Sequence, residues 1–143
     1  MYRINKHEES DMRKLIITSV ILMSTIVKAE IAGYYGKGFQ GKLSASGYIY
    51  NMNDMTCASN VHEFGTVLKV TNRSNGKSVK VVVTDRGSFD RKYGRHIDLS
   101  KKAFSQLDVL GKGLLNVDIK VISTKNTFRY KHESPTFDIK EYL

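Results

Sequence analysis

The stretch VVVTDRGSFDRKYGRHIDLS, residues 81–100, places a carboxylate at each of two points where the chain changes direction. Its β-branched start predicts a strand that ends at Asp85, where an Arg-Gly pair favours a turn. A second apolar run ends at Asp98, just before Ser100, a residue type that caps helices well. Two acids at the ends of rigid elements, with arginines near both, are the first candidates for a functional site.

The residues before this stretch predict a β-hairpin. Val67–Thr71 and Ser78–Thr84 are rich in β-branched side chains. Between them lies Asn75-Gly76, the strongest short turn signal for a hairpin. The second strand of this hairpin therefore carries Asp85 at its end.

The residues after it predict a short helix and a further strand. Ala103, Phe104 and Leu107 recur at helical spacing behind the cap. LLNVDIKVIS, residues 114–123, returns to alternation, which puts Val117, Ile119 and Val121 on one face. The fold class expected is mainly β: a small closed or nearly closed barrel with one or two short helices, in which closure would remove exposed strand edges.

The N-terminus reads as a secretory signal. MRKLIITSVILMSTIVKAE, from residue 12, has two cations, a short apolar run and a small residue at Ala29. The apolar run is too short to span a bilayer, which needs roughly 20 residues. We expect cleavage after Ala29, export to the periplasm, the cell envelope or the medium, and no stable membrane insertion of the mature chain.

Charge and cysteine content restrict the partners. After residue 29 the chain has 18 Lys and Arg against 11 Asp and Glu, a net charge of +7, which favours a polyanionic partner. Export argues against nucleic acid, so a cell-envelope polymer fits better. The single cysteine, Cys57, cannot form an internal disulfide, and no His or Cys pair has metal-ligand spacing. We expect neither metal nor cofactor, and a monomer.

Several motifs together resemble a known family. In order they are GYYGKGFQGKLSASG, MNDMTCAS, FGTVLKVTN, NGKSVKVVVTDRGSF and RHIDLSKKAF, all within residues 32–122. This order and spacing is similar to that of the RlpA-type double-psi β-barrel proteins. The resemblance implies a six-stranded double-psi β-barrel related to expansins. It also implies lytic transglycosylase activity on peptidoglycan, in which a 1,6-anhydro end forms without water.

The resemblance puts Asp85 at the position of the family's catalytic aspartate, where it would act as acid and base. Two other family positions are altered: Ser59 stands where the family has histidine, and Tyr48 where it has glutamate. We expect both side chains to support Asp85 by hydrogen bonds in one open cleft. Because the histidine and glutamate are absent, a non-catalytic, expansin-like glycan-binding module is the alternative, and a scaffold protein is a third.

Other residues are assigned more simply. Tyr35 and Arg86 are expected to bind substrate. Asp98 is expected to be structural, either capping backbone N–H groups or pairing with Arg86 or Arg95. His62 and His96 read as surface or groove residues rather than as bases.

The expected organisation has three parts. Residues 1–29 are an extension plus signal, with the core signal at 12–29. Residues 30–123 form the barrel, and residues 124–143 form a polar C-terminal tail wrapped on the barrel or partly disordered.

Overall fold

The computed structural model describes residues 28–88, 94–133 and 135–143, so the expected signal up to residue 27 lies outside the described part of the chain. The strands are β1 (Glu30–Tyr35), β2 (Thr56–Ala58), β3 (Val67–Asn72), β4 (Ser78–Asp85), β5 (Arg95–Ser100) and β6 (Leu115–Ser123). The helices are α2 (Lys101–Leu107) and the short 3-10 turns η1 (Lys37–Phe39), η3 (Leu110–Lys112) and η4 (Ile139–Glu141).

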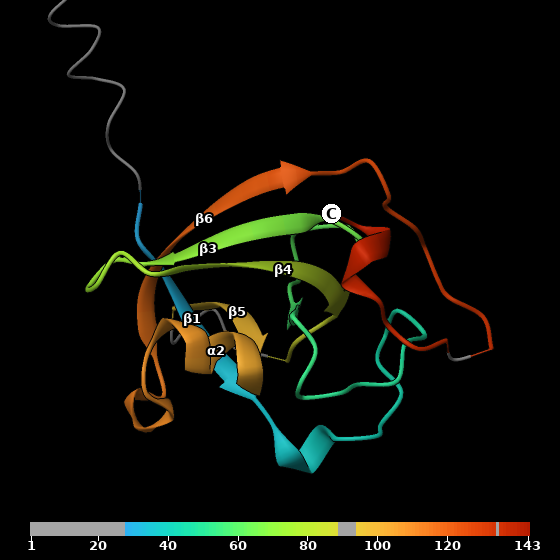
Figure 1. Ribbon diagram of the computed structural model, residues 1–143, viewed down its shortest axis with the longest axis horizontal. Coiled ribbons are helices and arrows are strands. Elements are labelled where there is room, and N and C mark those ends of the chain that lie inside the picture. The colour runs from blue at the N-terminus through green and yellow to red at the C-terminus, as the bar shows by residue number, and fades with distance from the viewer. Residues whose placement is uncertain (1–27, 89–93, 134) are drawn as a thin grey trace, which may run out of the picture.

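The six strands close into one barrel in the order β1-β5-β2-β4-β3-β6 (Figure 1). The pairs β1–β5 and β2–β4 are parallel, and the other neighbours are antiparallel. This confirms the expected six-stranded barrel with short helices. β3 and β5 lie three strands apart in either direction around the ring, so they form opposite walls.

The hairpin and the helix form where their local signals predict. Gly76 has a φ of 74° in the turn between β3 and β4, a left-handed conformation that glycine adopts at no steric cost. Ser100 caps α2, because its hydroxyl accepts a hydrogen bond from the Ala103 N–H at 3.2 Å.

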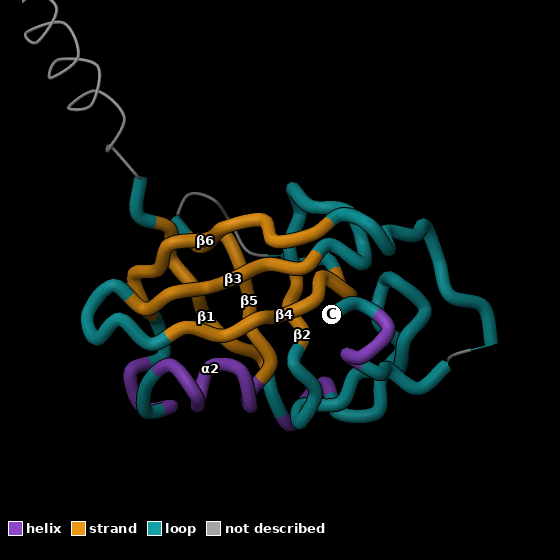
Figure 2. Tube along the Cα trace, turned by 45° about the horizontal axis from the view of Figure 1, so that its top comes forward, coloured by secondary structure: helices purple, strands orange, loops and turns teal. Residues whose placement is uncertain are grey.

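The barrel interior is filled by alternate residues of the strands and closed at one side by α2 (Figure 2). Phe104 and Leu107 of α2 are fully buried, and the Phe104 ring packs on Tyr34 of β1 at 4.6 Å. Each such side chain contributes roughly 1.5–3 kcal/mol by leaving water. On β6, Val117 is buried in the interior as expected. Burial decreases toward the end of the strand, where Val121 is 44% exposed.

The described parts of the C-terminal segment, residues 124–133 and 135–143, pack on the outside of β3 and β4. Val67 and Val82 are paired across these strands and point outward, where Phe137 and Tyr142 cover them. Tyr48 completes this second apolar cluster. The composition of the segment is polar, but its aromatic residues are placed to bury this outer apolar patch.

Candidate active-site groove

Asp85 lies where β4 leaves the barrel wall. The β2–β4 register pairs Ala58 with Asp85 after a bulge, and the bulge accompanies the end of regular pairing. The N–H groups of Ala45 and Arg86 both donate to Asp85 Oδ1 at 2.9 Å. Among the described residues none donates to Oδ2, so backbone N–H groups hold only one of the two oxygens.

Asp85 faces a groove made of two adjoining hollows, which we call the Asp85 groove. The hollow at Asp85 has a volume of about 110 Å³, and the next has about 410 Å³. Four residues line both hollows: Tyr35, Phe39, Ser88 and Asp98. The groove therefore runs from the end of β4 across β1 and the η1 turn.

Aromatic rings form one wall of the groove. Tyr35 stacks on Tyr50 with ring centroids 4.3 Å apart, and Phe39 meets the edge of Tyr35 at 5.6 Å. Burial raises the pKa of the Tyr35 phenol far above its ordinary value, and the negative charge of Asp85 adds to the shift, so this hydroxyl stays protonated. Phe39 is 52% exposed and offers an apolar face to a sugar ring.

Asp98 shares the groove with Asp85 but is already paired. Its Oδ1 accepts a hydrogen bond from Arg95, which is one of the two arginine partners expected. The pair lies against Gly33, where a Cβ would come within 2.9 Å of Asp98 Oδ1. Glycine on β1 thus makes room for this ion pair on the groove wall.

The Arg86 side chain turns away from Asp98 toward the segment that follows β2. Its guanidinium donates to the Ser59 carbonyl at 2.6 Å and to the His62 carbonyl at 2.8 Å. It also lies 4.0 Å from the Phe64 ring centroid, within range of a cation–π contact. Arg86 lines the Asp85 groove and also a second hollow of about 330 Å³.

Ser59 does not reach the groove as expected. Its backbone N–H donates to the Asp85 carbonyl at 3.0 Å, so the backbones of the two residues lie side by side. Its side chain is turned inward, however: Ser59 is 1% exposed, and its hydroxyl accepts from the Val61 N–H at 3.3 Å. The extra residue at the irregularity in the β2–β4 pairing is Thr84 of β4, between Val83 and Asp85.

Tyr48 also differs from its expected place. It is 2% exposed, and its hydroxyl pairs with that of Tyr142 at 2.6 Å, within the second apolar cluster. Its ring meets the edge of the Phe137 ring at 5.5 Å. Tyr48 is therefore held by the C-terminal segment and does not line the groove at Asp85.

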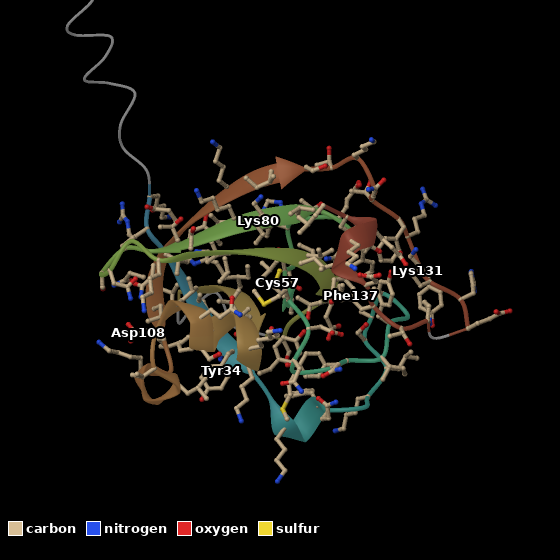
Figure 3. The ribbon with its side chains drawn as sticks, viewed as in Figure 1. Tyr34, Cys57, Lys80, Asp108, Lys131 and Phe137 are labelled. Atoms are coloured by element: carbon tan, nitrogen blue, oxygen red, sulfur yellow. The ribbon has the colours of Figure 1, made fainter. Side chains whose placement is uncertain are left out.

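The C-terminal segment does hold the loop that carries Ala45. The Lys131 N–H donates to the Ser46 carbonyl at 2.7 Å, and the Lys131 carbonyl lies where a Cβ of Gly47 would be, at 2.0 Å. Figure 3 shows Lys131 and Phe137 on this side of the barrel. Ala45, whose N–H donates to Asp85, thus lies on a loop that contacts with the C-terminal segment hold in position.

The two histidines bond in different ways, His96 through its side chain and His62 through its backbone carbonyl. His96 Nδ1 accepts from the Ile31 N–H at 3.2 Å, beside the irregularity in the β1–β5 pairing. His62 contributes its carbonyl to Arg86.

Within residues 28–88, 94–133 and 135–143, no helix has the length and apolar character needed to cross a membrane.

Two contributors to the groove were not among the expected site residues. Phe39 is the most exposed aromatic of the groove, and its signal was a lone ring among glycines in GKGFQG. Ala45 acts through its backbone N–H, which leaves no trace in the residue type.

Residues 27–119 match a family model described as lytic transglycolase. The endolytic peptidoglycan transglycosylase RlpA of Campylobacter jejuni is 46% identical over 92 residues, which cover 64% of this chain and 33% of that protein. RlpA of Vibrio cholerae is also 46% identical over 92 residues, which cover 64% of this chain and 34% of that protein. The chain thus matches about a third of the length of these curated relatives.

Two solved structures share the fold. Streptomyces papain inhibitor aligns with a TM-score of 0.54 and 23% identity, over 67% of this chain and 94% of its own. A mutant expansin of Clavibacter michiganensis, in complex with cellohexaose, aligns with a TM-score of 0.52 and 20% identity. The alignment covers 70% of this chain and 52% of the expansin. At these identities the likeness concerns the fold alone.

Proposed function

Because the chain belongs to the lytic transglycolase family of RlpA-type double-psi β-barrels, we propose that it cleaves peptidoglycan glycan strands without water, with Asp85 as acid and base. The protein would act on the cell wall after export, in line with the expected signal and its positive charge. The chain corresponds to one part of its longer relatives, so its activity and substrate are ours to propose.

One observation carries the proposal: the two oxygens of Asp85 have different roles. Oδ1 is held by two backbone N–H groups, and Oδ2 has no donor among the described residues. A carboxyl held at one oxygen has a defined orientation, and the other oxygen is free to exchange a proton with a bound sugar. The aromatic wall at Tyr35 and Phe39 would hold the sugar rings beside it.

The reaction needs only this one carboxyl. In the first step the Asp85 carboxylic acid gives its proton to the glycosidic oxygen between N-acetylmuramic acid and N-acetylglucosamine, and the carbon–oxygen bond breaks. In the second, the C6 hydroxyl of the same muramic acid attacks the anomeric carbon and closes a 1,6-anhydro ring. The proton released by that hydroxyl returns to the Asp85 carboxylate, which restores the acid. No water is consumed, so no second residue is required to activate one.

The test is the product. Purified sacculi, with and without their peptide stems, are incubated with the protein, and 1,6-anhydromuropeptides are sought by mass spectrometry. Asp85→Asn is expected to lower their formation by roughly 10²–10⁴-fold. Asp108→Asn, an acid beyond α2, is the matched control and should leave it unchanged. Absence of anhydro products from every preparation, or their undiminished formation by Asp85→Asn, rejects the proposal.

A second candidate is a binding module that holds wall glycan without cleaving it. The observation that favours it is the place of Ser59, whose buried hydroxyl supplies no acid or base to the groove. In that case the protein pellets with sacculi and forms no product. Asp85→Asn would then pellet as well as the wild type, whereas Phe39→Ala would pellet less.

A further inference from the structure

Three lysines form a row on the outside of the barrel. Lys69 of β3 is paired in register with Lys80 of β4 on one side and with Lys120 of β6 on the other. All three side chains are exposed, while the neighbours of Lys69 along β3, Leu68 and Val70, are fully buried. Adjacent strands lie about 4.8 Å apart, so three ammonium groups stand side by side across the sheet. Figure 3 labels Lys80 on this wall.

The row is not neutralised by the protein. Among the described residues no acid forms an ion pair with any of the three lysines. The nearest acid on the same face of β6, Asp118, pairs instead with Arg73 at 3.0 Å. Like charges directly opposite each other on neighbouring strands are destabilising. The fold carries this row at a cost in stability that a bound anion would offset.

The centre of the row lies on the barrel wall opposite β5, although β4 carries both Lys80 and, at its end, Asp85. β3, at its centre, is three strands from β5, which carries Asp98 and Arg95 of the groove. A polymer strand in the Asp85 groove therefore leaves the row free for another strand. Beside the row is a hollow of about 270 Å³, lined by Lys80 and by a fourth cation, Lys125. The positive surface extends in this direction along the edge of the C-terminal segment.

We propose that the lysine row binds the carboxylates on the peptide stems of a second peptidoglycan strand, next to the strand held in the groove. The identity of the polymer rests on the proposed function. Lysines suit this task because each flexible side chain ends in a compact charge. Each ammonium group can therefore bind one mobile carboxylate independently of its neighbours. Such contacts are weak one by one and add along a polymer, so they bring the groove to its substrate without fixing a register.

The experiment measures pelleting with sacculi across a salt series. The variant is Lys69→Gln, Lys80→Gln and Lys120→Gln together; the control is Lys102→Gln, Lys112→Gln and Lys140→Gln, which removes the same charge from exposed positions elsewhere. The row variant should bind roughly tenfold more weakly, with a flatter salt dependence, and should be no less stable than the wild type. The control should bind like the wild type.

Treated sacculi identify the ligand. Amidation of the stem carboxylates should reduce wild-type binding to the level of the row variant, and removal of phosphate-bearing polymers should leave it unchanged. The inference is overturned if the row variant binds like the wild type, if the control loses as much, or if phosphate removal abolishes binding. Lysine-dependent binding to anionic lipid vesicles in place of sacculi overturns it as well.

Pelleting needs no cleavage, so the two proposals fail separately. Lysine-dependent pelleting without any anhydro product contradicts the transglycosylase alone. Anhydro product together with lysine-independent pelleting contradicts the lysine row alone.

Discussion

The hydroxyl groups of Tyr48 and Tyr142 share a hydrogen bond of 2.6 Å, although 94 positions separate the two residues in the chain. Burial raises the pKa of Tyr142 above its ordinary value, and the bond to Tyr48 adds to the shift, so the Tyr142 hydroxyl stays protonated. Tyr48 follows directly on the loop whose Ala45 N–H holds Asp85. The contact therefore links the C-terminal segment to the candidate acid.

Tyr142→Phe should test this link. The change leaves the buried Tyr48 hydroxyl without its partner, which costs about 1–3 kcal/mol of unfolding free energy. The amide of Ala45 should exchange with solvent faster than in the wild type, as measured by hydrogen exchange and NMR. Tyr130→Phe, at an exposed ring, is the control. Unchanged exchange at Ala45 would show that the tyrosine pair does not hold the loop.

Gly47→Ala and Gly41→Ala separate backbone strain from contact with the C-terminal segment. Both glycines have positive φ, 93° and 78°, so both substitutions are strained. Only at Gly47 does the new Cβ meet another backbone, the Lys131 carbonyl at 2.0 Å. Gly47→Ala should lose about 1–3 kcal/mol more stability than Gly41→Ala in urea unfolding. Equal losses would mean that the segment moves away without cost.

Ser59→His introduces the residue type that the family resemblance led us to expect at this position. Because the site is buried and the serine hydroxyl accepts from Val61, an imidazole there overfills the packing. We expect a loss of about 1–3 kcal/mol in unfolding free energy and no gain in anhydro product. A rise in product would show that the new side chain turns into the groove.

Asn72→Ala removes a side chain that ties the hairpin to α2. Asn72 is fully buried, and its Nδ2 donates to the Leu107 carbonyl at 3.1 Å, at the helix end where carbonyls lack internal partners. We expect thermal unfolding to show a loss of about 1–3 kcal/mol. Asn116→Ala, at an exposed position on β6, should change stability little.

Asp108 should make stability depend on pH. The Val109 N–H donates to its Oδ1 at 2.7 Å and holds the pKa of this carboxyl below its ordinary value, with help from Asn72. A lowered folded-state pKa stabilises the protein above the unfolded-state pKa, and this contribution is lost as pH falls through the folded-state pKa. Wild type should therefore exceed Asp108→Asn in stability near neutrality. Urea unfolding down to about pH 3 should show the difference shrinking. A difference that is independent of pH would contradict this.

Local signals predicted the elements that depend on neighbouring residues. The Asn75-Gly76 turn, the Ser100 cap and the alternation of β4 each act within a few residues, so the hairpin, α2 and the position of Asp85 at a strand end followed from the sequence. The family motifs added the six-stranded, double-psi form of the barrel. The expected partners of Asp85 did not follow, because both side chains are buried and bond elsewhere: Ser59 accepts from the Val61 N–H, and Tyr48 pairs with the Tyr142 hydroxyl.

The sequence by itself determined that a carboxylate, Asp85, stands at the end of a buried strand, since this is a local pattern. Only the tertiary structure decided what surrounds it. The Ala45 N–H, the exposed Phe39 ring and the Tyr142 hydroxyl come from distant segments, and the lysine row exists only through the register of three strands. Backbone donors and cross-strand neighbours depend on how the chain closes on itself, and no single stretch of sequence encodes that closure.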